Sequence, residues 1–359
     1  MLDFASDETH LLLNPRLPAD ERARLETMYA AAPRLRAHVW LSTSGTTGSL
    51  KLVALSKQAI LASAAAVNRH LESTSRDVWC CVLPTFHVGG LGIYARAFLS
   101  GARVIASSWD PHSFVSLCNS EGVTLASLVP AQVRDLRGLR VPSSLRAIVV
   151  GGGAFADEHA GWPLLPSYGM TETASQVATA KPGNPDLVLL DHIEARIEAG
   201  HIALRGESLL TGYMVERRAL ARRQLPGGLK PAAPHFEDPK RDGWFVTPDL
   251  GSIDGRILHV RGRSGDFVKI GGESVDLSRL DRILAEIEPN AAIVAAADER
   301  LGHVIHLAFA AADSERIVTA FNERVLPFER IRAVHRVDAI PRTPLGKLKR
   351  SALARGLGI

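Results

Sequence analysis

Residues 43–51 read Thr43-Ser44-Gly45-Thr46-Thr47-Gly48-Ser49-Leu50-Lys51. The two glycines let the backbone bend sharply and approach a ligand closely. Backbone amides, hydroxyl groups and one lysine ammonium together form a cradle suited to a polyphosphate anion. A plain Ser/Thr/Gly turn is the alternative interpretation of the same residues.

This segment differs from the phosphate loop of the mononucleotide-binding NTPases. That loop needs a glycine and a lysine side by side, followed by Ser or Thr. Here Gly48 and Lys51 are separated by two residues, and Leu52 follows the lysine. The apolar runs at 40–41 and 52–55 predict a strand on each side. A loop between two strands lacks the helix N-terminus with which a P-loop binds phosphate.

The composition excludes several classes of protein. The 359 residues are enough for one large domain and a smaller one. The 42 basic and 38 acidic residues nearly balance, so we expect no nucleic-acid partner. No apolar run approaches the ~18 residues of a membrane helix, and the N-terminus lacks a secretory pattern. The three cysteines fit neither a disulfide framework nor a zinc site. We therefore expect buried thiols in a cytoplasmic protein.

Apolar strands alternate with helices as far as residue 150. Strands are predicted at 78–83, 103–106, 124–129 and 146–150, and helices at 57–70 (after a Ser56 cap), 91–99, 111–119 and 131–136. This alternation predicts an α/β fold with mostly parallel sheets flanked by helices. Such sheets bind ligands beyond the carboxyl ends of their strands. The expected site therefore includes the loops at 84–90, 151–153 and 168–172.

The second half of the chain has a different texture. Short strands from about residue 191 predict a small β-rich part, and residues 219–242 predict a surface loop. Beyond residue 263, helices at 277–286 and 314–324 and strands at 292–296, 304–310 and 333–337 predict a small α+β unit. We expect a large N-terminal domain, residues 1–262, and a small mobile C-terminal domain, residues 263–359.

Two loops of the large domain carry side chains suited to nucleotide chemistry. His87, in a Pro/Gly loop, can gate a pocket or contact a ligand, although a structural histidine is the alternative. In the segment Tyr168–Glu172, a tyrosine ring can stack on a base, a threonine can reach a phosphate and a glutamate can hold Mg²⁺. A strand–turn–helix with Thr171 as its cap is the alternative there.

Three later positions add to this set. Asp249, held in a turn, suits a ribose diol, although an isolated Asp in a turn is unremarkable. Arg263 lies at the junction of the two domains, where it can contact a nucleotide. Lys347 stands on a loop stiffened by proline and glycine, and a solvated basic tail is the alternative interpretation.

In this order the segments resemble the adenylate-forming (AMP-binding) superfamily of acyl-CoA synthetases, adenylation domains and firefly luciferases. The resemblance runs from about residue 38 to 350 and rests on Thr43–Lys51, Leu83–Gly90, Gly151–Ala154, Tyr168–Glu172, Gly206–Tyr213, Gly243–Gly251, Gly262–Gly272 and Pro341–Lys347. Among subfamilies, the chain is most similar to the o-succinylbenzoate–CoA ligases of menaquinone biosynthesis. That similarity lies in His87–Arg96, Gly101–Arg103, Ala126–Pro130 and Tyr168–Ser175.

The resemblance implies an ATP-dependent acid–CoA ligase that uses ATP, Mg²⁺ and coenzyme A. The carboxylic acid attacks the α-phosphorus of ATP and gives an acyl-adenylate and pyrophosphate, and the CoA thiolate then displaces AMP. In the family the small domain rotates between these two steps. Two alternatives are a stand-alone enzyme that loads an aryl or amino acid onto a carrier protein, and a non-catalytic nucleotide-binding relic.

The resemblance also implies a role for each site residue. The ATP- or AMP-binding residues are Thr43, Ser44, Gly45, Thr46, Thr47, Gly48, Lys51, Gly151, Gly152, Tyr168, Gly169, Asp249 and Arg263. The catalytic residues are Lys347, between the carboxylate and the α-phosphate, Thr171 at that phosphate, Glu172 at Mg²⁺ and His87 near the path of the thiol.

The acid and CoA are assigned to other residues. Arg96 and Ser175 bind the acid, and Arg96 does so through a charge-assisted contact with a second carboxylate. An ordinary surface arginine is the alternative for Arg96. Gly265, Gly271 and Gly272 serve the hinge and the surface that faces CoA.

The family carries a longer segment ahead of the phosphate loop, whereas 42 residues precede Thr43 here. The resemblance therefore implies a shortened large domain. We expect the core face exposed by this shortening to be covered by formation of a homodimer.

Overall fold

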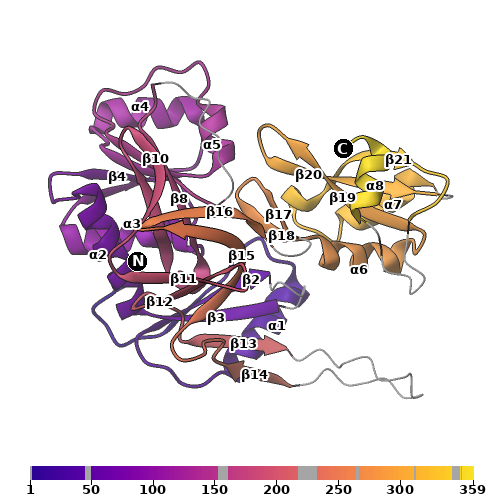
Figure 1. The fold of residues 1–359 in the computed structure, drawn as a ribbon, viewed down its shortest axis with the longest axis horizontal. Helices are drawn as coiled ribbons and strands as arrows, with labels where there is room; N and C mark the ends of the chain where they lie inside the picture. The colour runs from indigo at the N-terminus through magenta and orange to yellow at the C-terminus, as the bar shows by residue number, and fades with distance from the viewer. Residues whose placement is uncertain are drawn as a thin grey trace. The chain divides into compact units, whose positions relative to one another are not determined.

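The computed structural model describes residues 2–44, 50–152, 161–216, 233–263, 267–310, 313–341, 348 and 350–359. The chain divides into two compact units (Figure 1). The large unit comprises residues 1–43 and 49–264, and the small unit contains residues 265–359.

The large unit contains a sheet of eleven described strands, of which one half is parallel. The parallel half has the order β8-β7-β6-β4-β5, and each neighbouring pair in it is parallel. Its strands are β4 (Val78–Cys81), β5 (Arg103–Ala106), β6 (Leu125–Leu128), β7 (Ala147–Val150) and β8 (Leu164–Met170). The predicted parallel sheet of an α/β fold is confirmed.

Helices cover both faces of this parallel half. Helices α2 (Lys57–Leu71) and α3 (Val88–Ser100) pack on the face that includes Trp79 and Cys81. Helices α4 (Pro111–Glu121) and α5 (Pro130–Asp135) pack on the face that includes Cys80. Successive strand residues thus enter different clusters, as the two-residue period of a strand requires. All three cysteines are buried free thiols, as expected.

Two capping side chains set the starts of α2 and α4. The hydroxyl of Ser56 accepts a hydrogen bond from the Ala59 amide at 3.0 Å, at the predicted cap. The carboxylate of Asp110 accepts one from the Ser113 amide at 2.8 Å. A cap of this kind contributes about 1 kcal/mol.

Lys57, the first residue of α2, is buried and binds the N-terminal segment. Its ammonium donates to the carbonyl oxygens of Asp3 and Ser6 at 2.6 and 2.8 Å, and to the Ser6 hydroxyl at 2.9 Å. All three acceptors are neutral, so within the described part of the chain the buried charge is stabilised by hydrogen bonds and by no carboxylate.

The other half of the large sheet is antiparallel, and a second sheet lies in the same unit. The antiparallel strands are β9 (Ser175–Lys181), β10 (Asn184–Leu189), β11 (Ile193–Glu198), β12 (His201–Gly206), β15 (Phe245–Asp254) and β16 (Ile257–Arg263).

The second sheet has the described strands β1 (His10–Leu12), β2 (His38–Ser44), β3 (Leu50–Ser56), β13 (Gly212–Glu216) and β14 (Pro234–Glu237), packed against α1 (Ala19–Ala30).

The loop predicted for residues 219–242 is partly wrong. Pro234–Glu237 is strand β14, because its backbone pairs antiparallel with β13 over four residues. Residues 217–232 lie outside the described part of the chain.

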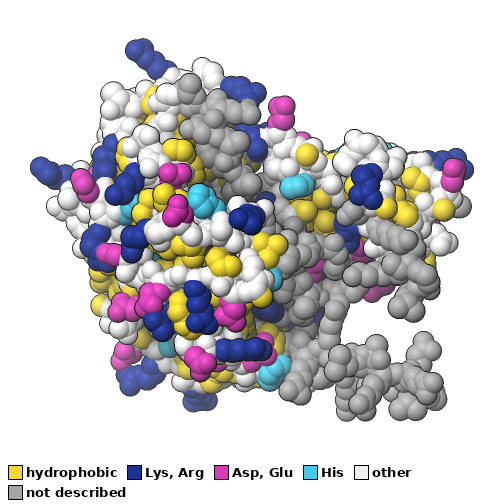
Figure 2. Space-filling model, in the orientation of Figure 1, with side chains coloured by type: hydrophobic (Ala, Val, Ile, Leu, Met, Phe, Trp, Pro, Cys, Tyr) yellow, Lys and Arg dark blue, Asp and Glu magenta, His cyan; other side chains and the backbone are white. Residues whose placement is uncertain are grey.

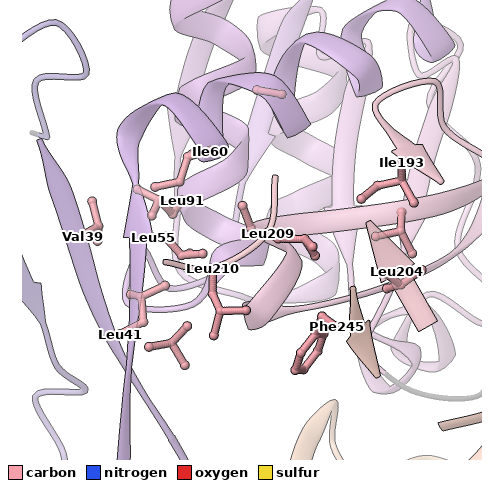
Figure 3. Close-up of a cluster of buried hydrophobic side chains, with 14 of the residues drawn as sticks. Val39, Leu41, Leu55, Ile60, Leu91, Ile193, Leu204, Leu209, Leu210 and Phe245 are labelled. Carbon is pink, nitrogen blue, oxygen red and sulfur yellow. The ribbon is translucent and has the colours of Figure 1, made fainter. Parts of the chain in front are cut away.

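One hydrophobic cluster joins the two sheets of the large unit (Figure 3). Leu41 and Leu55 come from β2 and β3, and Leu91 comes from α3. Leu204 and Phe245 enter from the antiparallel half of the large sheet. The cluster fixes β2 and β3, which contain the two ends of the segment 43–51, with respect to the large sheet.

The small unit has the predicted α+β composition. Its elements are β17 (Phe267–Ile270), β18 (Glu273–Asp276), α6 (Leu277–Ile287), β19 (Ala291–Asp298), β20 (Gly302–Phe309), α7 (Ser314–Asn322), β21 (Ile331–Arg336) and α8 (Arg350–Leu357). Strands β19, β20 and β21 form a sheet with α6 and α7 on one face and α8 on the other.

The surface carries both signs of charge. Figure 2 shows basic (dark blue) and acidic (magenta) side chains interspersed on the visible face. Ion pairs such as Arg69 with Asp191 (2.7 Å) and Arg103 with Glu121 (2.8 Å) join opposite charges. None of the described helices combines the length and the apolar character needed to cross a membrane.

His192 gives the large unit a built-in acid sensitivity. Among the described residues, neither of its two buried ring nitrogens has a hydrogen-bond partner. Burial lowers the pKa of His192 from 6.5 to about 4. Between these two values the unfolded chain holds a proton that the folded chain does not. The free energy of unfolding therefore falls as the pH drops from about 6.5 towards 4.

We expect His192→Leu to remove about 2 kcal/mol of the stability lost between pH 8 and pH 5. Urea unfolding followed by tryptophan fluorescence measures this, because all the tryptophans lie in the large unit: Trp40, Trp79, Trp109, Trp162 and Trp244. Exposed His112 supplies the control, His112→Leu. Equal acid sensitivity of wild type and His192→Leu would contradict this assignment.

Candidate active site

The site is built around the turn that follows β8. Thr171–Thr173 form one turn of 3₁₀ helix (η1) between β8 and β9. The buried hydroxyl of Thr173 accepts from the Met170 amide at 3.2 Å and donates to the Ser175 carbonyl at 2.9 Å. Thr173 rather than Thr171 therefore stabilises the turn, and the alternative with Thr171 as a helix cap is wrong.

Gly169 lies where the backbones of β8 and β9 approach closely. A Cβ at this position would lie 1.9 Å from the Ser175 carbonyl oxygen and 2.7 Å from Cα of Gln176. The pairing register also shifts between Tyr168 and Gly169. Any side chain at 169 would push the two backbones apart, so only glycine preserves this turn.

We expect Gly169→Ala to lower the free energy of unfolding of the large unit by about 3 kcal/mol or more, because the backbone must move. Chemical denaturation measures the change. The matched control is Gly122→Ala. Its Cβ meets nothing within 4 Å, so it incurs only the cost of a positive φ, about 1 kcal/mol. Equal losses in the two variants would show that the close approach at 169 is not limiting.

Tyr168 and Asp249, both predicted to bind nucleotide, are in direct contact. The Tyr168 hydroxyl donates to Oδ2 of Asp249 at 2.8 Å. Asp249 lies in β15 opposite Arg263 in β16, and the register shifts just after it, between Leu250 and Gly251. A bulge of this kind re-aims a side chain. The backbones of Asp249 and Arg263 are therefore side by side next to the tyrosine.

Glu172 and Lys51 share a neighbour, Tyr213. The Tyr213 hydroxyl donates to Oε1 of Glu172 at 2.8 Å. The Lys51 ammonium lies 4.5 Å from the centroid of the same ring. In the described part of the chain, no carboxylate pairs with Lys51 and no hydrogen bond reaches Oε2 of Glu172. A carboxylate oxygen left open in this way fits Mg²⁺, which prefers oxygen ligands.

In the sequence, Tyr213 is only the last residue of the motif Gly206–Tyr213, and no role was predicted for it. Its contacts depend on the antiparallel pairing of β13 with β3, which sets Tyr213 opposite Val53 and Val215 opposite Lys51. Lys51 and Tyr213 thus lie diagonally on one face of the pair. No local sequence signal reports a pairing between segments so far apart in the chain.

Arg96 is buried, with 1% of its surface exposed, and lies near the same turn. Its terminal nitrogens donate to the hydroxyls of Ser127 and Ser175, each at 3.2 Å. Its guanidinium carbon lies 5.2 Å from the centroid of the Trp79 ring. Gly92, one helical turn earlier, leaves room for it, because a Cβ there would lie 3.3 Å from Nη2. The alternative of a surface arginine is wrong.

This guanidinium is a buried charge for which the described part of the chain supplies no counter-ion. Its Nε has no hydrogen-bond partner, and among the described residues no carboxylate pairs with it. Burial lowers its pKa to about 10, so the group stays cationic at neutral pH. An uncompensated buried cation costs several kcal/mol. The cost is recovered when an anion reaches the guanidinium, and the site is therefore suited to an anionic ligand.

The remaining predicted residues fall into three groups. His87 lies just before α3, with its ring centroid 4.7 Å from that of Phe86, and Thr43 and the backbone of Ser44 end β2. Gly151 and Gly152 follow β7, and Gly271 and Gly272 form the turn of the β17–β18 hairpin with φ of 58° and 90°. Gly45, Thr46, Thr47, Gly48, Gly265 and Lys347 lie outside the described residues.

A comparison with protein families identifies the family to which the chain belongs. The family described as AMP-binding enzyme matches residues 31–214, which include Lys51, Arg96, Glu172 and Tyr213. The chain belongs to the AMP-binding enzyme family.

Individual relatives point to one branch of this family. The chain is 30% identical to a 2-succinylbenzoate–CoA ligase of Geobacillus kaustophilus, over 87% of this chain and 68% of that protein. It is 28% identical to the ligase of the same name from Listeria monocytogenes, over 89% and 70% of the two chains.

Solved structures give the same result. A double mutant of o-succinylbenzoate CoA synthetase from Bacillus subtilis, bound to a product analogue, superposes with a TM-score of 0.76 at 26% identity. The match covers 88% of this chain and 69% of the synthetase. An amide bond synthetase from Marinactinospora thermotolerans has a TM-score of 0.75 at 22% identity, over 89% and 69% of the two chains, and this likeness shows the fold alone.

Proposed function

We propose that the protein is an ATP-dependent acid–CoA ligase that converts 2-succinylbenzoate to its CoA thioester in menaquinone biosynthesis. The observation that carries the proposal is the buried guanidinium of Arg96, which pairs with no acidic side chain among the described residues and lies beside the Thr171–Ser175 turn. The similarity to 2-succinylbenzoate–CoA ligases supports the same acid. This substrate has two carboxylates, one to be activated and one to pair with Arg96.

The first step joins the acid to AMP. A carboxylate oxygen attacks the α-phosphorus of ATP, and the bond to the leaving pyrophosphate breaks. Thr171 contacts the α-phosphate, Lys51 and residues 43–48 hold the pyrophosphate part, and Tyr168, Asp249 and Arg263 hold the nucleoside. Glu172 would hold Mg²⁺, which would neutralise part of the negative charge. Such catalysis consists mainly of positioning and electrostatics.

The second step transfers the acyl group. The CoA thiolate attacks the acyl carbon and AMP leaves, with His87 near the thiol. Within the proposal, residues 1–262 are the adenylation domain and residues 263–359 the mobile domain that brings Lys347 to the first step and Gly271 and Gly272 to the second. The proposed location is the cytoplasm, where the three thiols stay reduced.

The proposal predicts that Arg96→Met lowers kcat/KM for 2-succinylbenzoate about 100-fold, because a charge-assisted contact is lost. The rate with benzoate, which has no second carboxylate, should stay within about twofold of wild type. Pyrophosphate release with ATP, Mg²⁺ and each acid measures both values. The control is Arg103→Met, which removes an exposed arginine paired with Glu121.

Two outcomes would contradict the assignment. If wild type releases no pyrophosphate with 2-succinylbenzoate but does so with simple aryl or fatty acids, the proposed acid is wrong. If Arg96→Met lowers the rate of pyrophosphate release equally with both acids, Arg96 does not bind the second carboxylate.

We also propose that the protein forms a homodimer. Two neighbouring apolar side chains near the end of α3 support this, since Phe98 and Leu99 are 52% and 43% exposed. Phe98 also contacts Phe4 at a centroid distance of 5.7 Å. Sedimentation equilibrium should give twice the chain mass of 38.7 kDa, and Phe98→Ser should shift the mass towards a single chain. A well-behaved monomer in the wild type would contradict the dimer.

A further inference from the structure

We propose that Tyr213 is a positioning residue that couples Lys51, beside the phosphate-binding loop, to Glu172, the magnesium-binding carboxylate. The inference rests on the proposed function, because Lys51 and Glu172 take their roles from it. It adds a third residue to the site and assigns separate tasks to the two parts of one side chain.

The first task belongs to the hydroxyl. Tyr213 is buried, with 4% of its surface exposed, and a buried phenol needs a hydrogen-bond partner. The hydroxyl donates to Oε1 of Glu172 at 2.8 Å, and no described group donates to Oε2. The carboxylate is thereby held in one orientation with one oxygen available to a cation. A partner of this kind tunes the affinity of the metal ligand.

The second task belongs to the ring. The Lys51 ammonium lies 4.5 Å from its centroid, within the range of a cation–π contact. A lysine at the end of a flexible chain loses much rotamer freedom when it binds phosphate. The aromatic face restricts the rotamers of Lys51 before the phosphate binds. Because the ring contacts Lys51 and the hydroxyl on the same ring contacts Glu172, the positions of the two residues are linked through one rigid side chain.

The backbone around Tyr213 supports this coupling. The Leu210 amide donates to the Glu172 carbonyl at 2.8 Å, and the Thr211 amide donates to the Ala54 carbonyl at 2.8 Å. Strand β13 then pairs with β3. The short segment before Tyr213 is therefore attached both to the turn that carries Glu172 and to the strand that carries Lys51.

The two tasks can be separated by two substitutions. Tyr213→Phe removes only the hydroxyl, and we expect it to raise the Kd of ATP about 10-fold in saturating Mg²⁺ but less than twofold in EDTA. Tyr213→Leu also removes the aromatic face, and we expect it to weaken ATP binding in EDTA as well. Isothermal titration calorimetry measures all four constants without turnover.

Matched variants test whether the effect is local. Tyr29→Phe removes a hydroxyl from a tyrosine that packs against Trp40 in the same unit, and it should leave both constants unchanged. Adding Tyr213→Phe to Glu172→Gln should have little further effect on binding in Mg²⁺, because the hydroxyl acts through that carboxylate. Thermal melting of each variant checks that the large unit is folded.

The outcomes separate this inference from the proposed function. If wild type binds no ATP in Mg²⁺, the proposed function fails. If wild type binds ATP but Tyr213→Phe weakens binding equally in Mg²⁺ and in EDTA, or not at all, the coupling fails while the function stands. Additive losses in the double variant would also overturn it.

Discussion

The pairing of β8 is the constraint on which the site depends. This strand is parallel to β7 on one side and antiparallel to β9 on the other, so it joins the two halves of the large sheet. The change of direction needs a turn immediately after β8, and that turn carries Thr171 and Glu172. Because Gly169 has no Cβ atom, the backbone of β9 can lie closer to β8 than any other residue at this position would allow. The pairing of the backbones thereby sets the positions of Thr171 and Glu172 independently of side-chain contacts.

Three side chains then connect this turn to the rest of the large unit. Tyr168 reaches Asp249 in the antiparallel half, Tyr213 reaches Glu172 from the second sheet, and Arg96 reaches Ser175 from α3. Two of these contacts involve groups without a full set of partners. Among the described residues, Arg96 has no counter-ion and one oxygen of Glu172 has no hydrogen-bond partner. Buried polar groups with unfilled hydrogen-bonding or ion-pairing capacity lower the stability of the fold, and they are typical of ligand-binding sites.

The sequence predicted local features well because they depend on neighbouring residues. Runs of apolar residues located strands β2 to β7, and Ser56 marked the start of α2. Features that depend on distant segments escaped prediction. Strand β14 exists only because β13 is available to pair with it. The burial of Arg96 depends on the space left by Gly92 and on Ser127 and Ser175, which come from other strands.

The bonds of Lys57 give the N-terminal segment an unexpected importance. Residues 3–6 form a short segment that belongs to no helix or strand, and only Phe4 in it is part of the hydrophobic core. Yet they supply every acceptor that the structure shows for a buried ammonium. Trimming or proteolytic loss of this segment would leave that charge inside the protein without hydrogen bonds. The penalty would be that of a core mutation, out of proportion to the few residues removed.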